Sequence, residues 1–153
     1  MKKFLPWILF LFPVFVFLQS LPFKFSGAAE TVYIFDTLGA WFGSIGLTAI
    51  AEPFAKFGAY GVGSVELVAS ILLLIPATRH WGALIGAGVL SGAIFFHLFT
   101  PLGVSVEFPG AAEGGEPAVF VMAVLAWCCL VALVFIHRKR YPFVGGAADP
   151  AIA

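Results

Sequence analysis

Charged residues are scarce in this chain. Asp, Glu, Lys and Arg make up 10% of its 153 residues, whereas roughly 25% is normal in soluble domains. Hydrophobic residues make up 61%, and the mean hydropathy is +1.06. This composition excludes an ordinary soluble domain. The few cations are spread between apolar stretches and form no extended basic run, so we expect no binding to nucleic acid.

Motifs of self-contained enzymes are also missing. The sequence has no Walker motif, no dinucleotide-binding fingerprint and no nucleophile elbow. Of its three histidines, only His97 falls well inside an apolar stretch, whereas His80 and His137 fall at the ends of such stretches. Haem held by two histidines within a membrane therefore has no support, and we predict no metal site. We expect no catalytic site of its own, and at most a subunit of a membrane oxidoreductase.

Cysteine is limited to one adjacent pair, Cys128 and Cys129, in the middle of the last apolar stretch. Neighbouring residues on a helix point about 100° apart, which opposes a disulfide between them. A Cys-x-x-Cys motif is absent, and with it the signature of thioredoxin-like redox proteins. We interpret the pair as small buried hydrophobic residues, with a thiol relay or a metal site as the alternative.

Long apolar runs are what the sequence does have. Four of them, at residues 4–21, 58–75, 81–99 and 118–137, approach the 17–25 residues that a membrane-spanning helix needs. They predict an all-α fold, a single transmembrane four-helix domain over residues 1–141, and a disordered tail over 142–153. Gly82 and Gly86, and again Gly88 and Gly92, are four residues apart, which favours close helix packing within one chain or in a homo-oligomer.

Charges of opposite sign alternate between the apolar runs. Lys2, Lys3, Arg79 and Arg138–Arg140 flank the runs at alternate ends, and most acids lie in the other connections. Cytoplasmic loops carry an excess of Lys and Arg. We therefore expect a multi-pass protein of the cytoplasmic membrane with both termini in the cytoplasm.

The first run has a second interpretation. Two lysines, an apolar stretch and the small residues 26–29 are also typical of a secretory signal with a cleavage site. The length of the stretch favours a retained span, and cleavage stays open as the alternative.

Two connections between the spans are expected on the outer side of the membrane. Residues 30–38 predict a short amphipathic helix that ends at Gly39. Residues 41–51 are apolar but too few to cross the bilayer before Glu52 and Pro53 interrupt them, which predicts an interfacial segment over the outer mouth of the bundle. The second connection, residues 100–117, is either flexible or held against that mouth.

Glu66 is the sharpest candidate for a functional residue, because it lies about halfway along the second span. Placing a charged side chain there costs on the order of 3 kcal/mol. At helical spacing its face carries Val62, Gly63, Ala69 and Ser70, so the carboxylate is expected to point into the bundle. It either ties helices together by hydrogen bonding or serves a ligand, a proton or an ion.

Lys24 and His97 are predicted at the same level as Glu66. Lys24 follows the first span, where it either extends to the interface or turns inward to pair with an acid. His97 lies near the outer end of the third span, which must neighbour the second because the turn between them is short. The sequence thus allows an outward-facing cluster of Lys24, Glu66 and His97.

Four motifs resemble the DoxX-like family of small four-span membrane proteins. They are L-P-F-K-F-S-G at residues 21–27, I-F-D-T-L-G at 34–39, G-S-V-E-L-V-A-S-I-L-L-L-I-P-A-T-R at 63–79, and G-A-I-F-F-H-L at 92–98. The resemblance covers roughly residues 4–137. It implies a bundle of four helices in the cytoplasmic membrane, linked in some relatives to redox systems, with a quinone as the cofactor that such a system would use.

The family's recurring polar positions would fall on Lys24, Glu66 and His97, whereas the cysteine pair is not part of its pattern. Our leading hypothesis is an accessory subunit or membrane partner of a redox system, with an outward-facing polar pocket for a ligand or an outer-face redox protein. The alternatives are a small solute or proton-coupled carrier, and a structural or assembly protein without its own activity.

Overall fold

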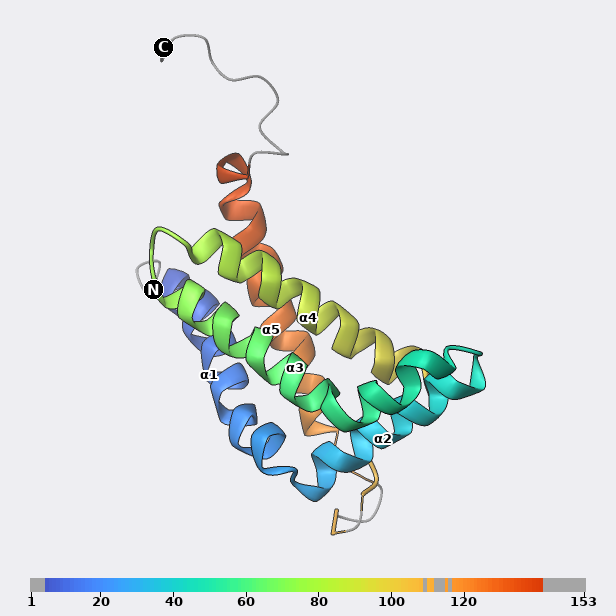
Figure 1. Cartoon of the computed structure of the whole chain (residues 1–153). Coiled ribbons are helices and arrows are strands. Elements are labelled where there is room, and N and C mark those ends of the chain that lie inside the picture. The colour runs from blue at the N-terminus through green and yellow to red at the C-terminus, as the bar shows by residue number, and fades with distance from the viewer. Residues whose placement is uncertain (1–4, 109, 112–114, 116, 142–153) are drawn as a thin grey trace, which may run out of the picture.

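The chain folds into five α-helices, as seen in a computed structural model that describes residues 5–108, 110–111, 115 and 117–141 (Figure 1). The helices are α1 (Leu5–Ser26), α2 (Ala29–Ser44), α3 (Thr48–Leu74), α4 (Arg79–Phe99) and α5 (Ala118–Ile136), followed by one 3-10 turn at Arg138–Arg140. The predicted all-α fold is confirmed. The predicted tail, residues 142–153, lies outside the described residues.

Four of these helices, α1, α3, α4 and α5, are long and apolar enough to cross a membrane. They pack as a bundle in which α1 and α4 run in one direction and α3 and α5 in the other (Figure 1). The chain is therefore a multi-pass membrane protein with four candidate spans, as the sequence predicts.

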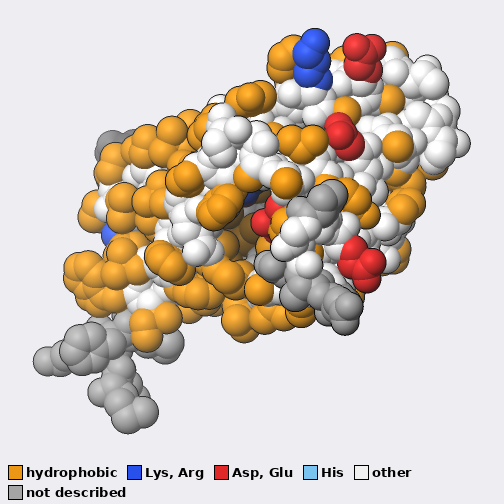
Figure 2. All heavy atoms as spheres, turned by 90° about the horizontal axis from the view of Figure 1, so that it is seen from below, with side chains coloured by type: hydrophobic (Ala, Val, Ile, Leu, Met, Phe, Trp, Pro, Cys, Tyr) orange, Lys and Arg blue, Asp and Glu red, His pale blue; other side chains and the backbone are white. Residues whose placement is uncertain are grey.

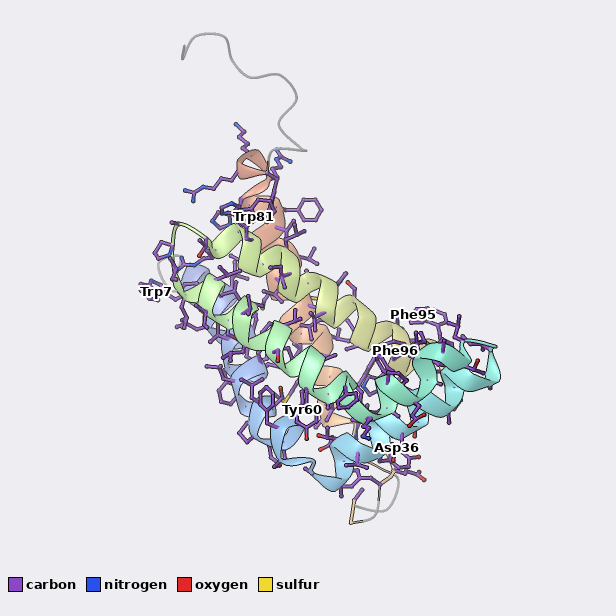
Figure 3. The ribbon with its side chains drawn as sticks, viewed as in Figure 1. Trp7, Asp36, Tyr60, Trp81, Phe95 and Phe96 are labelled. Carbon is purple, nitrogen blue, oxygen red and sulfur yellow. The ribbon has the colours of Figure 1, made fainter. Side chains whose placement is uncertain are left out.

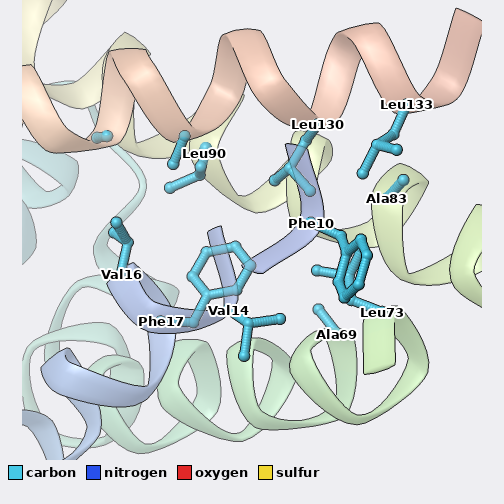
Figure 4. Packing of buried hydrophobic residues seen from close by; sticks show 12 residues of the cluster. Phe10, Val14, Val16, Phe17, Ala69, Leu73, Ala83, Leu90, Leu130 and Leu133 are labelled. Carbon is cyan, nitrogen blue, oxygen red and sulfur yellow. The ribbon is translucent and has the colours of Figure 1, made fainter. Parts of the chain in front are cut away.

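The core lies where all four spanning helices meet (Figure 4). Phe17 of α1, Leu73 of α3, Ala83 of α4 and Leu130 of α5 are at most 1% exposed. Because α1 supplies Phe17 and further buried side chains, the core is complete only when α1 stays in place. Retention or cleavage of the first span stays a prediction.

The glycines of α4 serve two different purposes. A Cβ at Gly82 would lie 2.6 Å from the backbone nitrogen of Leu73, and one at Gly86 would lie 2.9 Å from the side chain of Leu130. These two glycines allow the close packing that the sequence predicts. A Cβ at Gly88 or Gly92 would meet no atom within 4 Å, so this second pair borders open space.

Between the first two spans, the predicted boundaries were wrong. α2 does not end at Gly39, because Gly39 lies within it and faces α3, where a Cβ would come within 2.7 Å of the Ala55 Cβ. Pro53 does not interrupt α3, because it lies near the start of the helix and deprives only the Ala49 carbonyl of its N–H donor. Residues 41–44 thus end α2, and residues 48–51 begin α3.

α2 and the first part of α3 form a hairpin in the region for which an interfacial segment was predicted (Figure 1). Its inner side is aromatic: the ring of Phe54 lies 4.9 Å from that of Phe42 and 6.0 Å from that of Phe96, measured between centroids. These contacts join the hairpin to α4. Leu102 and Val106 are buried against Leu38 of α2, so the described part of the 100–117 loop is held against the bundle.

The two ends of the bundle differ in charge. Arg79 and Arg138–Arg140 lie at the end where α4 begins and α5 ends, here called the basic end. Most described acids lie at the opposite end, here called the acidic end. Trp7 and Trp81 lie toward the basic end (Figure 3) and are 59% and 38% exposed, as tryptophans at a lipid–water interface are. Which end faces the cytoplasm stays a prediction.

Side chains tie the helices together at the basic end. The Arg79 Nε donates a hydrogen bond to the Leu73 carbonyl, which would otherwise lack a donor at the end of α3, and the guanidinium stacks 3.7 Å from the Phe10 ring centroid. The Tyr141 hydroxyl donates a hydrogen bond of 2.7 Å to the His80 carbonyl. Tyr141 thereby fastens the end of α5 to the start of α4.

Candidate functional site

A cavity of about 860 Å³ lies in the half of the bundle nearest the acidic end. All five helices contribute to its walls, which are mainly apolar. Figure 2 looks onto the acidic end and shows a hollow between hydrophobic side chains, with cationic and acidic side chains visible at its edge. The volume is within the range of roughly 300–1,000 Å³ that is usual for small-molecule sites.

Glu66 lies in the wall of this cavity, on the side of α3 that faces the other helices. The buried residues of α3 include Ala59, Gly63, Glu66 and Ala69, which follow helical spacing along one face. Gly63 keeps the face open one turn before Glu66, where a Cβ would already lie 3.3 Å from the Phe25 ring. The small-residue face predicted from the sequence therefore turns the carboxylate into the bundle.

Lys24 pairs with Glu66. Its Nζ lies 2.7 Å from the Glu66 Oε2, and the two side chains are 17% and 6% exposed. The pairing is possible because α1 runs to Ser26, beyond the predicted end of the span at residue 21. Lys24 thus stands in the last helical turn and reaches inward, which decides between its two predicted orientations.

Ser20 completes this arrangement and was missed by the sequence analysis. Its Oγ accepts a 2.7 Å hydrogen bond from the Lys24 Nζ. The same hydroxyl lies 3.1 Å from the Glu66 Oε2 and 2.8 Å from the Phe17 carbonyl oxygen, and it donates its single proton to one of these two oxygens. The available signal was its position four residues before Lys24, on the same face of α1. Polar residues that also line the cavity and were not predicted are Gln19, Glu30 and Thr31.

His97 borders the same cavity from α4 but, within the described residues, is not hydrogen-bonded to Lys24 or Glu66; its hydrogen bond is with the following loop. It is 6% exposed, its Nδ1 lies 2.6 Å from the Gly103 carbonyl, and its ring packs edge-on against Phe120. The structure therefore places all three predicted residues around one cavity, two of them in direct contact.

The cavity ends at the apolar core. Phe17, Leu90 and Ala123 belong both to the cavity wall and to the buried core cluster. Ser70 and Ser91, the polar residues that a continuing path would need, do not line the cavity. Their hydroxyls donate to the backbone carbonyls of Glu66 and Ala87. Within the described residues, no polar route continues from the cavity toward the basic end.

The cysteine pair lies apart from this cavity. Cys128 is exposed on the surface of α5 and Cys129 is half-buried, and neither lines the cavity. The prediction that both are buried is wrong for Cys128, because α5 turns that side chain away from the other helices. The described part of the chain brings no three His, Cys, Asp or Glu side chains together in a metal-binding group.

Comparisons with protein-family models, with curated proteins and with solved structures find no match for this chain. The DoxX-like resemblance thus rests on the four motifs alone.

Proposed function

We propose that this protein binds a small, mainly apolar ligand in its cavity, and that it acts as an accessory subunit or membrane partner of a redox system. The observation that carries the binding proposal is the buried Lys24–Glu66 pair in the wall of an otherwise apolar cavity of about 860 Å³. An apolar cavity with a few converging polar groups is the usual form of a small-molecule site. The redox role is what the DoxX-like resemblance implies, and a quinone is the ligand that it suggests.

A carrier is the second candidate, and the shape of the cavity argues against it. A transported solute or proton needs polar groups on both sides of the binding site. Here the core closes the cavity toward the basic end, and Ser70 and Ser91 face elsewhere. A structural protein would use the ion pair only to orient helices, and it would have no use for the open space beside Gly88 and Gly92.

Photolabelling tests the binding proposal directly. The protein is reconstituted in lipid nanodiscs with a diazirine-bearing hydrocarbon, and labelled residues are mapped by mass spectrometry. We expect labels on cavity residues such as Val62 and Ala93, which decrease several-fold in the double variant Gly88→Leu/Gly92→Leu. Both glycines have free space at the Cβ position, so the leucines fill the cavity without displacing backbone.

Ser64→Leu is the matched control, because Ser64 is exposed on α3 and does not line the cavity. It adds a side chain of the same size outside the site and should leave cavity labelling unchanged. Labels confined to outward-facing residues, in wild type as in the variants, would overturn the proposal.

The redox role has a separate test. Cells that lack this chain are complemented with wild type or with Glu66→Gln, and the phenotype of the deletion and the amount of protein in the membrane are both measured. We expect Glu66→Gln to insert normally and to fail in complementation. Full rescue by this variant would mean that the site plays no part in the physiological role.

A further inference from the structure

The hydrogen-bonding groups that remain free in the cavity define the ligand that it accepts. Glu66 has two carboxylate oxygens, and only Oε2 is engaged, by Lys24 and Ser20. Its Oε1 has no hydrogen-bond partner within the described residues. A carboxylate oxygen only accepts hydrogen bonds, so Glu66 offers the cavity an acceptor.

His97 offers a second acceptor. Its Nδ1 lies 2.6 Å from the Gly103 carbonyl oxygen. Because a carbonyl only accepts, Nδ1 must carry the proton and donate it. In the neutral ring, Nε2 is then the unprotonated nitrogen with a free lone pair. The loop contact therefore fixes the tautomer of the ring, and Nε2 has no partner within the described part of the chain.

Both acceptors are open to the cavity. Within the described residues, one side-chain polar atom is both inaccessible to solvent and without a hydrogen-bond partner, and it is the Nδ1 of His80. The Glu66 Oε1 and the His97 Nε2 also lack hydrogen-bond partners, so these two atoms must have accessible surface. Since both side chains are only 5–6% exposed overall and both line the cavity, the space that these atoms reach is the cavity.

The ion pair limits the charge of a ligand. A cation at Glu66 would lie beside the Lys24 ammonium, which already stands 2.7 Å from Oε2. An anion drawn to Lys24 would lie equally close to the Glu66 carboxylate. Like charges so close in a poorly solvated site repel strongly. The third N–H of Lys24 has no partner in the described residues, and it can donate to a neutral oxygen.

We infer that the cavity takes an uncharged alcohol or phenol with an apolar body. Its hydroxyl donates to the Glu66 Oε1 or the His97 Nε2 and can accept from Lys24, while the body lies against the apolar wall. A hydroxyl is the smallest neutral group that donates and accepts hydrogen bonds through a single atom. This inference rests on the proposed binding function and adds the chemical class of the ligand. Of the two forms of a quinone cofactor, only the phenolic quinol fits this class, because the carbonyl oxygens of a quinone cannot donate a hydrogen bond.

Competition between matched compounds tests it. The wild-type protein in nanodiscs is photolabelled with the diazirine hydrocarbon in the presence of 1-dodecanol, its methyl ether, dodecylamine or dodecanoic acid. The ether keeps the oxygen and the chain but donates no hydrogen bond. Loss of one hydrogen bond to a charged acceptor lowers affinity about tenfold or more. We therefore expect 1-dodecanol to displace the probe at about a tenth of the ether concentration, ahead of the amine and the acid.

The outcomes separate the two proposals. Cavity labelling that the ether displaces as well as the alcohol, or that the amine or acid displaces best, overturns the inference and leaves the binding function standing. No cavity labelling by the probe overturns both.

In a second measurement, His97→Phe should reduce the advantage of the alcohol over the ether, and Ser91→Ala, outside the cavity, should keep it. An unchanged advantage in both His97→Phe and Glu66→Gln would also overturn the inference.

Discussion

At the scale of single residues, the notable arrangement is the Glu66 carboxylate, of which one oxygen takes part in both polar contacts. Lys24 and Ser20 both act on the Oε2 of Glu66, and both come from the last two turns of α1. A buried ion pair adds little net stability by itself, whereas losing one partner leaves a buried charge without compensation. The pair therefore constrains the register of α1 against α3 more than it stabilises the fold.

The two halves of the pair should be unequal in a stability measurement. Lys24→Met leaves the more buried carboxylate alone, and we expect a loss of roughly 3–5 kcal/mol, the usual cost of breaking a buried pair. Glu66→Gln should cost less, because Lys24 is 17% exposed and can still donate to the amide oxygen. Thermal unfolding in one detergent checks both variants.

The double variant Lys24→Met/Glu66→Leu is the control for charge. It removes both charges and keeps similar volume, so most of the lost stability should return. A double variant as unstable as Lys24→Met alone would show that packing at Lys24, and not the uncompensated charge, causes the loss.

At this scale the sequence was informative about charge and much less about hydroxyls. Glu66 and Lys24 were predicted because a charge in an apolar span is costly and calls for a counter-charge. Ser20 gave no such signal, since a serine in a membrane helix can bond its own backbone, as Ser70 and Ser91 do here. Only the fold shows which serine faces an acid.

At the scale of elements, the four spans could be predicted because twenty apolar residues have few alternatives in a membrane protein. The apolar part of α3 was located correctly, but its helix begins ten residues earlier than the predicted span, at Thr48. Hydropathy reports where a helix enters the hydrocarbon and not where it begins. Gly39 was taken as a helix end because a glycine that caps a helix and one that lets two helices approach look alike in sequence.

The glycines of α4 give a paired test of that difference. Gly82→Ala would put a Cβ within 2.6–2.9 Å of the α3 backbone, so we expect a destabilisation of about 1–3 kcal/mol. Gly88→Ala meets no atom within 4 Å and should stabilise by up to about 1 kcal/mol through helix propensity. Denaturation in mixed micelles compares the two, and equal effects would contradict the assigned packing.

Tyr141 should make the free energy of unfolding decrease at high pH. Burial raises the pKa of its hydroxyl, so the stability linked to it is fully present below the unfolded value of about 10 and is lost as the pH rises through the folded value. We expect Tyr141→Phe to cost about 0.5–1.5 kcal/mol at neutral pH, from the hydrogen bond to His80.

The deficit of Tyr141→Phe relative to wild type should then shrink above about pH 10, where wild type loses stability that the variant lacks from the start. Unfolding temperatures from pH 7 to 11 measure it. A deficit that stays constant over this range would mean that the hydroxyl is not responsible.

At the scale of the whole molecule, the charges separate into a basic and an acidic end, and the positive-inside rule gives them an orientation. We expect the C-terminus and the turn at Arg79 in the cytoplasm and the acidic end outside. A cytosolic fluorescent reporter fused to the C-terminus should be bright. In a Cys128→Ala/Cys129→Ala background, Asp36→Cys should react with a membrane-impermeant maleimide in intact cells.

Arg79→Cys in the same background serves as the opposite marker and should react only after the membrane is opened. Labelling of Arg79→Cys in intact cells, together with a protected Asp36→Cys, would reverse the orientation and would place the cavity on the cytoplasmic side.

The size of the cavity has a consequence for how its affinity is measured. The cavity of about 860 Å³ has mainly apolar walls, which hold water poorly. In a bilayer or a micelle, the competing occupant is a hydrocarbon tail at very high local concentration. Ligand binding is then an exchange, and its apparent Kd depends on the tail that must leave. The same protein should therefore show different affinities in short-chain and long-chain hosts, with no change in its own contacts.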